Sequence, residues 1–313
     1  MGKTAFLFSG QGAQHPGMGK ELCAQYSEAK TVYESASEAF GFDLLALSCN
    51  GSEEELAKTA VSQPLIYTLS MAAFAVVRAG GMNFDAVAGF SLGEVSALTA
   101  AGAFSLETGF KVIAARAAEM QAAAEQTPGA MFAVIGGTEE TVEAACEKAR
   151  SQQGGIAVPV NYNCPGQIVI AGQEETVCAA AKELGDAGLR VVRLSVNAAF
   201  HSPLMQNASE RFYEKIKNFD LQPPQKAVYS NVTGIRAEIP DPAAYLKTQM
   251  TRPVRFTQEM AAMSADGIDR FVELGPGKTL CGFIRKGLRG AAFYNVEDPA
   301  TVGKCLQAFT AQS

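Results

Sequence analysis

A serine with a glycine two residues away on either side stands where an apolar strand gives way to a helix, in Gly89-Phe90-Ser91-Leu92-Gly93. Residues 86–90 predict a buried strand, and residues 92–101 predict a helix. This context is typical of a nucleophile elbow, because the sharp turn strains the serine backbone and the glycines let the chain pass closely. The hydroxyl then faces a helix N-terminus, which stabilises negative charge. A chance match between common residues is the alternative, and the strand–turn–helix context favours the elbow.

Strands and helices alternate along much of the chain. Strands are predicted at residues 4–8, 86–90, 228–231 and 271–274, and helices over about 20–80, 92–101 and 106–126, after Pro203 and from Thr301. This alternation predicts an α/β fold, in which a parallel sheet is covered by helices on both faces.

The middle of the chain has a different pattern. Strands are predicted at residues 131–135, 156–161, 167–171 and 190–196, with helices at 139–150 and 174–187. The order β-α-β-β-α-β is that of the ferredoxin-like unit. The sequence therefore predicts a large domain from residues 1–127 and 197–313, with a smaller ferredoxin-like subdomain, residues 128–196, inserted into it.

The composition excludes several classes of protein. A net charge of −6 argues against a general nucleic-acid binder. Gly or a charged residue is expected to break every apolar run before about 18 residues, so no membrane span is predicted. Seven scattered cysteines, never in a C-x-x-C pair, indicate reduced thiols in a cytoplasmic protein. With only two histidines, His15 and His201, a metal site of several histidines is not expected.

A serine nucleophile needs a base, and His201 is the only histidine after Ser91. It lies in a predicted loop before a helix, a common position for catalytic side chains, although a surface-loop histidine is the alternative. The early loop Gly10-Gln11-Gly12-Ala13-Gln14-His15 is not a dinucleotide-binding loop, because His15 replaces its third glycine. It is suited instead to placing a backbone N–H beside the serine.

An arginine lies at the edge of the apolar stripe of the predicted helix 106–126. Ile113 and Met120 flank Arg116 at helical spacing. A cation beside a buried apolar stripe is costly unless an anion pairs with it. A local pair with Glu119, three residues on, is the alternative, and the pattern alone does not choose between them.

Taken together, these residues resemble the malonyl-CoA:acyl carrier protein transacylases, the acyltransferases of fatty-acid and polyketide synthesis. The resemblance covers nearly the whole chain. It rests on Phe8-Ser9-Gly10-Gln11-Gly12, Gly89-Phe90-Ser91-Leu92-Gly93-Glu94, Asn161-Tyr162-Asn163-Cys164-Pro165-Gly166-Gln167, Ala199-Phe200-His201-Ser202, Pro253-Val254-Arg255-Phe256 and Glu273-Leu274-Gly275-Pro276-Gly277.

The resemblance implies an α/β-hydrolase-like core with a ferredoxin-like insert, and it implies a role for each site residue. Ser91 would be the nucleophile and His201 the base, with the backbone carbonyl of Gln249 orienting the imidazole. The backbone N–H groups of Gln11 and Leu92 would form the oxyanion hole, and Arg116 would hold the malonyl carboxylate. Residues lining the same pocket would be Gln63, Phe90, Met120, Asn161 and Phe200. Phe90 departs from the family pattern, which usually has His before the nucleophile.

The implied activity is a ping-pong transfer of the malonyl group from malonyl-CoA, through malonyl-Ser91, to the phosphopantetheine thiol of an acyl carrier protein. It needs no metal or redox cofactor. A serine esterase or thioesterase with the same elbow is the alternative, but neither needs a buried cation such as Arg116. A basic segment with Lys278, Arg285, Lys286 and Arg289 is predicted either to dock the acidic carrier protein or CoA phosphates or to be a solvated helix face.

Overall fold

The computed structural model describes residues 2–310 of the chain. Its strands are β1 Lys3–Phe8, β2 Ala86–Gly89, β3 Ala130–Ile135, β4 Ala157–Cys164, β5 Gln167–Gly172, β6 Arg190–Arg193, β7 Ala227–Tyr229, β8 Arg236–Ala237, β9 Ile268–Leu274 and β10 Ala292–Val296. Its α-helices are α1 Lys20–Gln25, α2 Ser27–Phe40, α3 Leu44–Asn50, α4 Glu53–Ala57, α5 Thr59–Ala79, α6 Gly93–Ala100, α7 Leu106–Gln126, α8 Glu139–Gln153, α9 Glu174–Asp186, α10 Gln206–Ile216, α11 Pro242–Gln249, α12 Phe256–Ala265, α13 Thr279–Gly287 and α14 Pro299–Thr310. A short 3₁₀ turn, Pro203–Met205, precedes α10.

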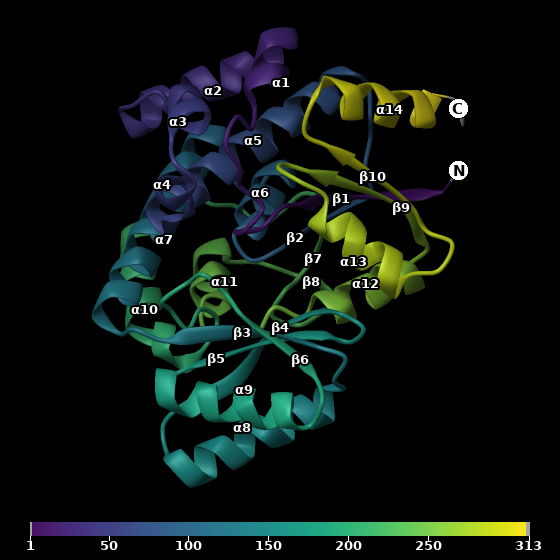
Figure 1. Cartoon of the computed structure of the whole chain (residues 1–313). Helices are drawn as coiled ribbons and strands as arrows, with labels where there is room; N and C mark the ends of the chain where they lie inside the picture. The colour runs from purple at the N-terminus through teal and green to yellow at the C-terminus, as the bar shows by residue number, and fades with distance from the viewer. Residues whose placement is uncertain (1, 311–313) are drawn as a thin grey trace.

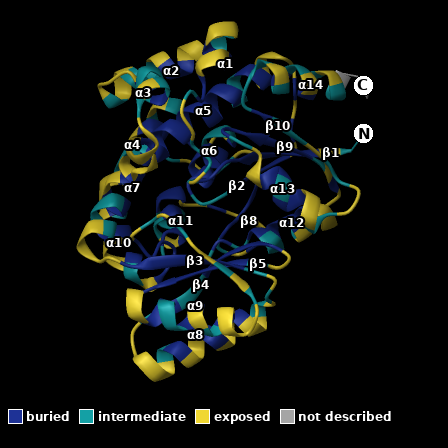
Figure 2. Ribbon diagram, in the orientation of Figure 1, coloured by how far each residue is buried: buried dark blue, intermediate teal, exposed yellow. Residues whose placement is uncertain are grey.

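The larger sheet has the order β10-β9-β1-β2-β7-β8, and every pair except β7–β8 is parallel (Figure 1). Alternate residues of its strands enter two separate cores. Phe6 and Phe8 pack in one core with helices that include α5 and α6, whereas Ala5 and Leu7 pack in the other with α12 and α13. Both faces are therefore covered, and the central strands β1 and β2 are almost wholly buried (Figure 2). The predicted α/β fold with a parallel-rich sheet is confirmed.

The smaller sheet has the order β4-β5-β3-β6, and its neighbouring strands are antiparallel. Phe132 and Val134 of β3 face a core shared with α8 and α9, which lie below the sheet in Figure 1. Met131 and Ala133, on the opposite face, join the main core. Val254 pairs with β4, because Tyr162 N donates to Val254 O at 2.8 Å and Val254 N donates to Val160 O at 2.8 Å. The smaller sheet is thus joined to the rest of the molecule by packing and by backbone pairing.

Two strand boundaries in this unit differ from the sequence-based expectation. The strand expected to end at residue 161 continues to Cys164, where it still pairs with Gln167 of β5. The connection is therefore the two-residue turn at Pro165 and Gly166, not a four-residue loop. The strand expected over 190–196 ends at Arg193.

One helix, α5, is long and apolar enough to cross a membrane by length and composition alone. The expectation that Gly or a charge interrupts every apolar run before about 18 residues is therefore wrong for this helix. In the structure, 78% of its most apolar window is buried, so α5 is a central core helix. It packs against α2 and α7, among other elements.

Candidate active site

The strained turn predicted at Ser91 is present between β2 and α6. Ser91 has a φ of 55°, and the only other non-glycine residue with a positive φ in the described chain is His201, at 60°. The flanking glycines are required by close packing, because a Cβ on Gly89 would lie 2.1 Å from Gly93 C and one on Gly93 would lie 2.2 Å from Phe8 O. Left-handed backbone at a non-glycine residue costs energy and persists where surrounding structure enforces it.

Ser91 and His201 are in direct contact. Ser91 Oγ lies 2.6 Å from His201 Nε2. The other ring nitrogen, Nδ1, faces two backbone carbonyls, Gln249 O at 3.0 Å and Arg252 O at 3.1 Å. Because carbonyls only accept, Nδ1 carries the proton in the neutral ring, and the lone pair of Nε2 points at the serine hydroxyl. The geometry is that of a serine and its base.

The electrostatics keep the His201 ring neutral. The residue is 3% exposed. Burial, together with the nearby positive charge of Arg116, lowers the pKa of His201 to about 4, against the favourable contacts with the two carbonyls. At neutral pH the ring therefore holds no charge and Nε2 is free to take up a proton.

Arg116 lies beside the nucleophile and is not paired with Glu119. Its Nη2 donates to Ser91 Oγ at 3.2 Å and to Gln249 Oε1 at 3.2 Å, and its Nη1 donates to Gln63 Oε1 at 2.9 Å. Glu119 contacts Arg211 and Lys215 of α10 instead, at 2.6 and 2.7 Å. The alternative of a local Arg116–Glu119 pair is therefore wrong.

The guanidinium of Arg116 remains a cation despite being only 1% exposed. Burial lowers its pKa to about 10, and the Glu94 carboxyl opposes that shift, so the group is charged at neutral pH. Two of its nitrogens are held by neutral amide oxygens, and Nε has no hydrogen-bond partner among the residues that the structure describes. A fixed positive charge thus stands 3.2 Å from the serine oxygen.

Gln249, at the end of α11, connects the three side chains described above. Its backbone carbonyl accepts from His201, its Oε1 accepts from Arg116, and its Nε2 donates to Ser91 O at 2.8 Å. The resemblance implied only the carbonyl contact. The side-chain contacts are additional, and they tie the base, the cation and the turn to one residue.

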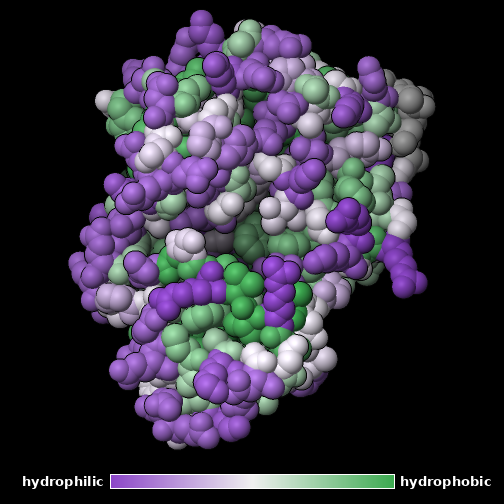
Figure 3. All heavy atoms as spheres, viewed as in Figure 1, coloured by the Kyte–Doolittle hydropathy of each residue, from purple (hydrophilic) through white to green (hydrophobic). Residues whose placement is uncertain are grey.

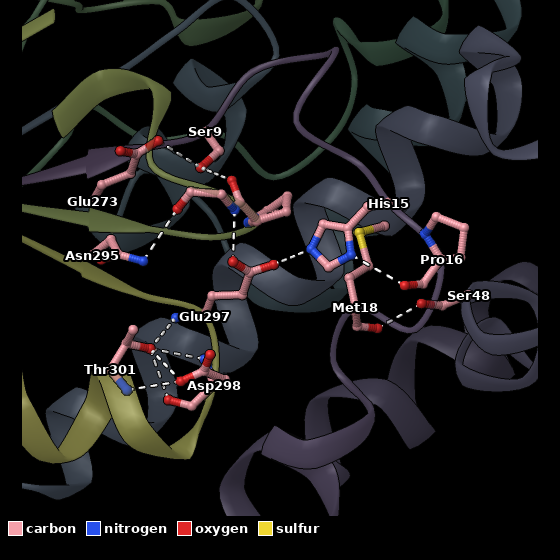
Figure 4. Close-up of polar contacts among 12 residues, drawn as sticks. Ser9, His15, Pro16, Met18, Ser48, Glu273, Asn295, Glu297, Asp298 and Thr301 are labelled. Atoms are coloured by element: carbon pink, nitrogen blue, oxygen red, sulfur yellow. Dashed lines mark hydrogen bonds and ion pairs between the residues drawn. The ribbon is translucent and has the colours of Figure 1, made fainter. Parts of the chain in front are cut away.

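The loop after β1 carries Gln11, and Leu92 is the residue at the N-terminus of α6. Gln11 Nε2 donates to Thr59 Oγ1 at 3.1 Å, which fixes the side chain against α5. Farther along the same loop, His15 is exposed and contacts Glu297, which also accepts from Gly277 N at 2.9 Å (Figure 4). His15 therefore anchors the loop and does not reach Ser91.

A cavity of about 390 Å³ opens beside Ser91. In Figure 3 the surface is hollowed between the parts of the molecule that carry the two sheets, and hydrophobic residues gather below the hollow. The predicted site residues that line the cavity are Gln11, Phe90, Ser91, Met120, Asn161, Phe200 and His201. Gln63 is fully buried and does not line it; it lies behind Met120, to whose sulfur its Nε2 points at 3.3 Å. Pocket lining by Gln63 is thus wrong, although it holds Arg116.

Phe90 occupies the position at which the resemblance led us to expect histidine. Its ring packs against Phe256 and Phe283, with centroids 5.7 and 5.9 Å apart. The departure from the family pattern thus replaces a polar group by part of an aromatic cluster that also forms one wall of the cavity.

Asn231 was not among the predicted site residues, and its side chain holds the backbone of the turn at Ser91. It is 1% exposed and accepts from Ser91 N at 2.8 Å. Its amide donates to Gly89 O at 2.7 Å. The available signal was position, because Asn231 follows β7, and the carboxyl ends of neighbouring parallel strands meet at one edge of the sheet.

No metal-ligand cluster of three or more His, Cys, Asp or Glu side chains occurs within residues 2–310. All seven cysteines are free thiols. The predicted basic residues Lys278, Arg285, Lys286 and Arg289 are all exposed, at and after the start of α13.

Comparisons with known proteins agree with this geometry. The family model described as acyl transferase domain matches residues 5–311. A malonyl CoA-acyl carrier protein transacylase of Bacillus subtilis is 37% identical over 309 residues, 98% of this chain and 97% of the relative. The structure of such a transacylase from Clostridium perfringens superposes with a TM-score of 0.94 at 37% identity, covering 99% and 98% of the two chains. A malonyl-transacylase solved with a type II PKS acyl-carrier protein is similar at a TM-score of 0.93 and 32% identity, over 98% and 99%. The chain therefore belongs to the acyl transferase family, among the malonyl CoA-acyl carrier protein transacylases.

Proposed function

We propose that the protein transfers a malonyl group from malonyl-CoA to the phosphopantetheine thiol of an acyl carrier protein, in support of fatty-acid synthesis. The observation that carries the proposal is the buried cation of Arg116, 3.2 Å from the hydroxyl of Ser91. A water-using esterase has no need of such a charge, whereas an acyl group that ends in a carboxylate needs a partner for it.

In the first half-reaction, Ser91 Oγ attacks the thioester carbonyl while its proton passes to His201 Nε2. The backbone N–H groups of Gln11 and Leu92 receive the oxyanion. Collapse of the intermediate breaks the C–S bond, and the imidazolium returns the proton to the leaving sulfur, so CoA departs as a thiol. Malonyl-Ser91 remains. The malonyl carboxylate offsets the charge of Arg116, which weakens the second of the two causes, after burial, that lower the pKa of His201.

The second half-reaction reverses these steps with a different thiol. The pantetheine thiol gives its proton to His201, its sulfur attacks the malonyl ester, and Ser91 Oγ leaves with that proton. Side chains and backbone groups of this chain carry every step, with CoA thioester as substrate and without a metal or redox cofactor.

Intact-protein mass spectrometry tests the proposal directly. After mixing with malonyl-CoA, the protein should gain the mass of one malonyl group, and addition of holo acyl carrier protein should remove it and malonylate the carrier. Loss of the adduct to water at the same rate without carrier would instead indicate a thioesterase. Absence of any adduct would overturn the proposal.

Arg116→Ala is expected to lower malonyl transfer by about a hundredfold or more, because the bidentate contact to the carboxylate is worth about 3 kcal/mol. Acetyl transfer should fall far less, since acetyl offers that guanidinium nothing. Arg116→Lys should restore only part of the malonyl activity, because a point charge lacks the planar fork. The measurement is kcat/KM for malonyl-CoA and acetyl-CoA in each variant.

Arg211→Ala is the matched control, because it removes an arginine that contacts Glu119 at 2.6 Å, whereas Arg116 contacts Ser91 Oγ. It should leave the ratio of malonyl to acetyl transfer unchanged. If Arg116→Ala lowers both transfers by the same factor, Arg116 supports the turn and does not select the substrate.

For the carrier protein we propose a docking surface on α13 and at its two ends, made of Lys278, Arg285, Lys286 and Arg289. Thr279 and Phe283 of α13 line the cavity, and the four basic residues are exposed, which supports a docking role for this helix. An acidic carrier protein or the phosphates of CoA would meet them by long-range attraction.

Charge reversal in Arg285→Glu with Lys286→Glu should raise KM for the carrier protein and weaken its dependence on salt, while kcat changes little. Steady-state kinetics at several ionic strengths measure both effects. Lys304→Glu, an exposed lysine on α14, is the control and should leave KM unchanged. Equal KM values for the double variant and the wild type would remove this surface from consideration.

We also propose the finer description of the architecture. The large unit, residues 1–127 and 197–313, is an α/β-hydrolase-like catalytic core, and residues 128–196 form a ferredoxin-like subdomain. The strand order β4-β5-β3-β6 with α8 and α9 on one face supports the second assignment. Seven free thiols support a reducing compartment, the cytoplasm.

A further inference from the structure

Two buried amide side chains form hydrogen bonds with the backbone of Ser91, one with its N–H and one with its carbonyl. Asn231 Oδ1 accepts from Ser91 N at 2.8 Å, and Gln249 Nε2 donates to Ser91 O at 2.8 Å. With a φ of 55°, Ser91 occupies a conformation that costs about 1–3 kcal/mol and has to be enforced by its surroundings. The two contacts provide that enforcement from opposite ends of the residue.

Every polar atom of Asn231 is committed to this task or to holding Asn231 itself. Its side-chain nitrogen donates to Gly89 O at 2.7 Å and to Glu259 Oε1 at 2.8 Å. Its backbone N donates to Glu94 Oε1 at 2.8 Å, and its carbonyl accepts from Arg255 N at 3.0 Å. An amide held this way has one orientation, with oxygen toward Ser91 and nitrogen toward Gly89.

The two carboxyls that hold Asn231 are themselves fully buried, on α6 and α12. Glu94 also accepts from Tyr245 Oη, and the second oxygens of Glu94 and Glu259 have no hydrogen-bond partner within residues 2–310. Burial raises the pKa of Glu94 to about 7 and, with the nearby Glu94, raises the pKa of Glu259 well above its usual range. Oε1 of Glu259 serves Asn231 as a hydrogen-bond acceptor.

We propose that Asn231, locked by Glu259 and Glu94, is a positioning residue that fixes the Ser91 backbone so that its hydroxyl meets the base and the thioester carbonyl. The inference rests on the proposed role of Ser91 as nucleophile. Asn231 touches neither substrate nor Oγ; it acts through Ser91 N and Gly89 O, one on each side of the turn. Displacement of a nucleophile by about 1 Å can slow a reaction about a hundredfold without weakening substrate binding.

The test is rapid-quench measurement of Ser91 malonylation in Asn231 variants of the full chain. Asn231→Leu keeps the branched shape of the side chain but has no acceptor for Ser91 N and no donor for Gly89 O. It should lower the rate constant for malonylation about a hundredfold, with the apparent dissociation constant for malonyl-CoA within about twofold of wild type. Asn231→Asp keeps the acceptor and loses the donor, so its rate should lie between those of Asn231→Leu and wild type.

The carboxyl that orients the amide is tested by rescue. Glu259→Ala removes the acceptor for Asn231 and should lower the rate about tenfold, whereas Glu259→Gln, which restores an acceptor oxygen at the same position, should recover most of that loss. Asn295→Leu is the matched control, because Asn295 lies on the edge strand β10, three strands from β2, and donates to Gly277 O at 3.3 Å. It should malonylate at the wild-type rate.

The possible results of these measurements lead to different conclusions. If wild-type protein forms no malonyl adduct, the proposed function fails and Asn231 is not at issue. If wild type reacts and the Asn231 and Glu259 variants lose only unfolding free energy, with their folded fraction reacting at the wild-type rate, Asn231 is merely structural and the inference is overturned. If Asn231→Leu does not fold, Asn231→Asp decides: an unchanged rate would also overturn it.

Discussion

Ser91→Ala is expected to abolish both the malonyl adduct and transfer to the carrier protein, while the protein remains folded. The hydroxyl is the only group at the elbow that can form the ester, and its contacts are with His201 and Arg116, both of which retain carbonyl or amide partners without it. Removing it should therefore cost little stability. Intact mass after incubation with malonyl-CoA, together with a thermal unfolding curve, measures both parts of the expectation.

Ser195→Ala is the control, because Ser195 is an exposed serine that lines the same cavity. It should acquire one malonyl group like the wild type. An adduct that persists in Ser91→Ala would mean that another side chain is acylated, and peptide mapping would then locate it.

His201→Ala is expected to slow malonylation by several orders of magnitude, because the base and the nucleophile work as a unit. With the ring gone, Ser91 Oγ keeps its contact to Arg116, a cation that donates and cannot accept its proton. Stopped-flow measurement of CoA release in the first turnover gives the rate constant for this step.

His15→Ala, which removes the only other histidine, should release CoA at close to the wild-type rate, because His15 contacts Glu297 and Pro16 and not the elbow. Near-normal first-turnover kinetics in His201→Ala would mean that a different group accepts the serine proton.

Much of the site could be read from the sequence because its chemistry permits few residue types. A strained serine between glycines and a single downstream histidine left little choice for the nucleophile and the base. The partner of Arg116 was harder to predict, because helical spacing was equally compatible with a local pair to Glu119. That question is decided by α10, which brings Arg211 to Glu119 across 92 residues of chain, and no local pattern reports such a contact.

The bounds of helices and strands could be predicted to within a few residues where hydrophobic periodicity sets them, as for α7. They were less predictable where pairing with another strand sets them. The strand β4 extends to Cys164 because β5 continues to pair with it. The role of Asn231 was not predictable, since an amide at a strand end takes its function from the direction in which its oxygen points. That direction is set by Glu259, 28 residues away.

The strand order β10-β9-β1-β2-β7-β8 also determines when during synthesis the protein can first become active. Ser91 emerges from the ribosome early, but Asn231 follows it by 140 residues, and the carbonyls that orient His201 come at Gln249 and Arg252. Contacts this distant in sequence form late, after the entropy of closing the intervening chain has been overcome. A nascent chain that already contains the Ser91 turn therefore lacks the residues that position the turn and orient the base. We expect it not to react with thioesters until most of the protein has been synthesised.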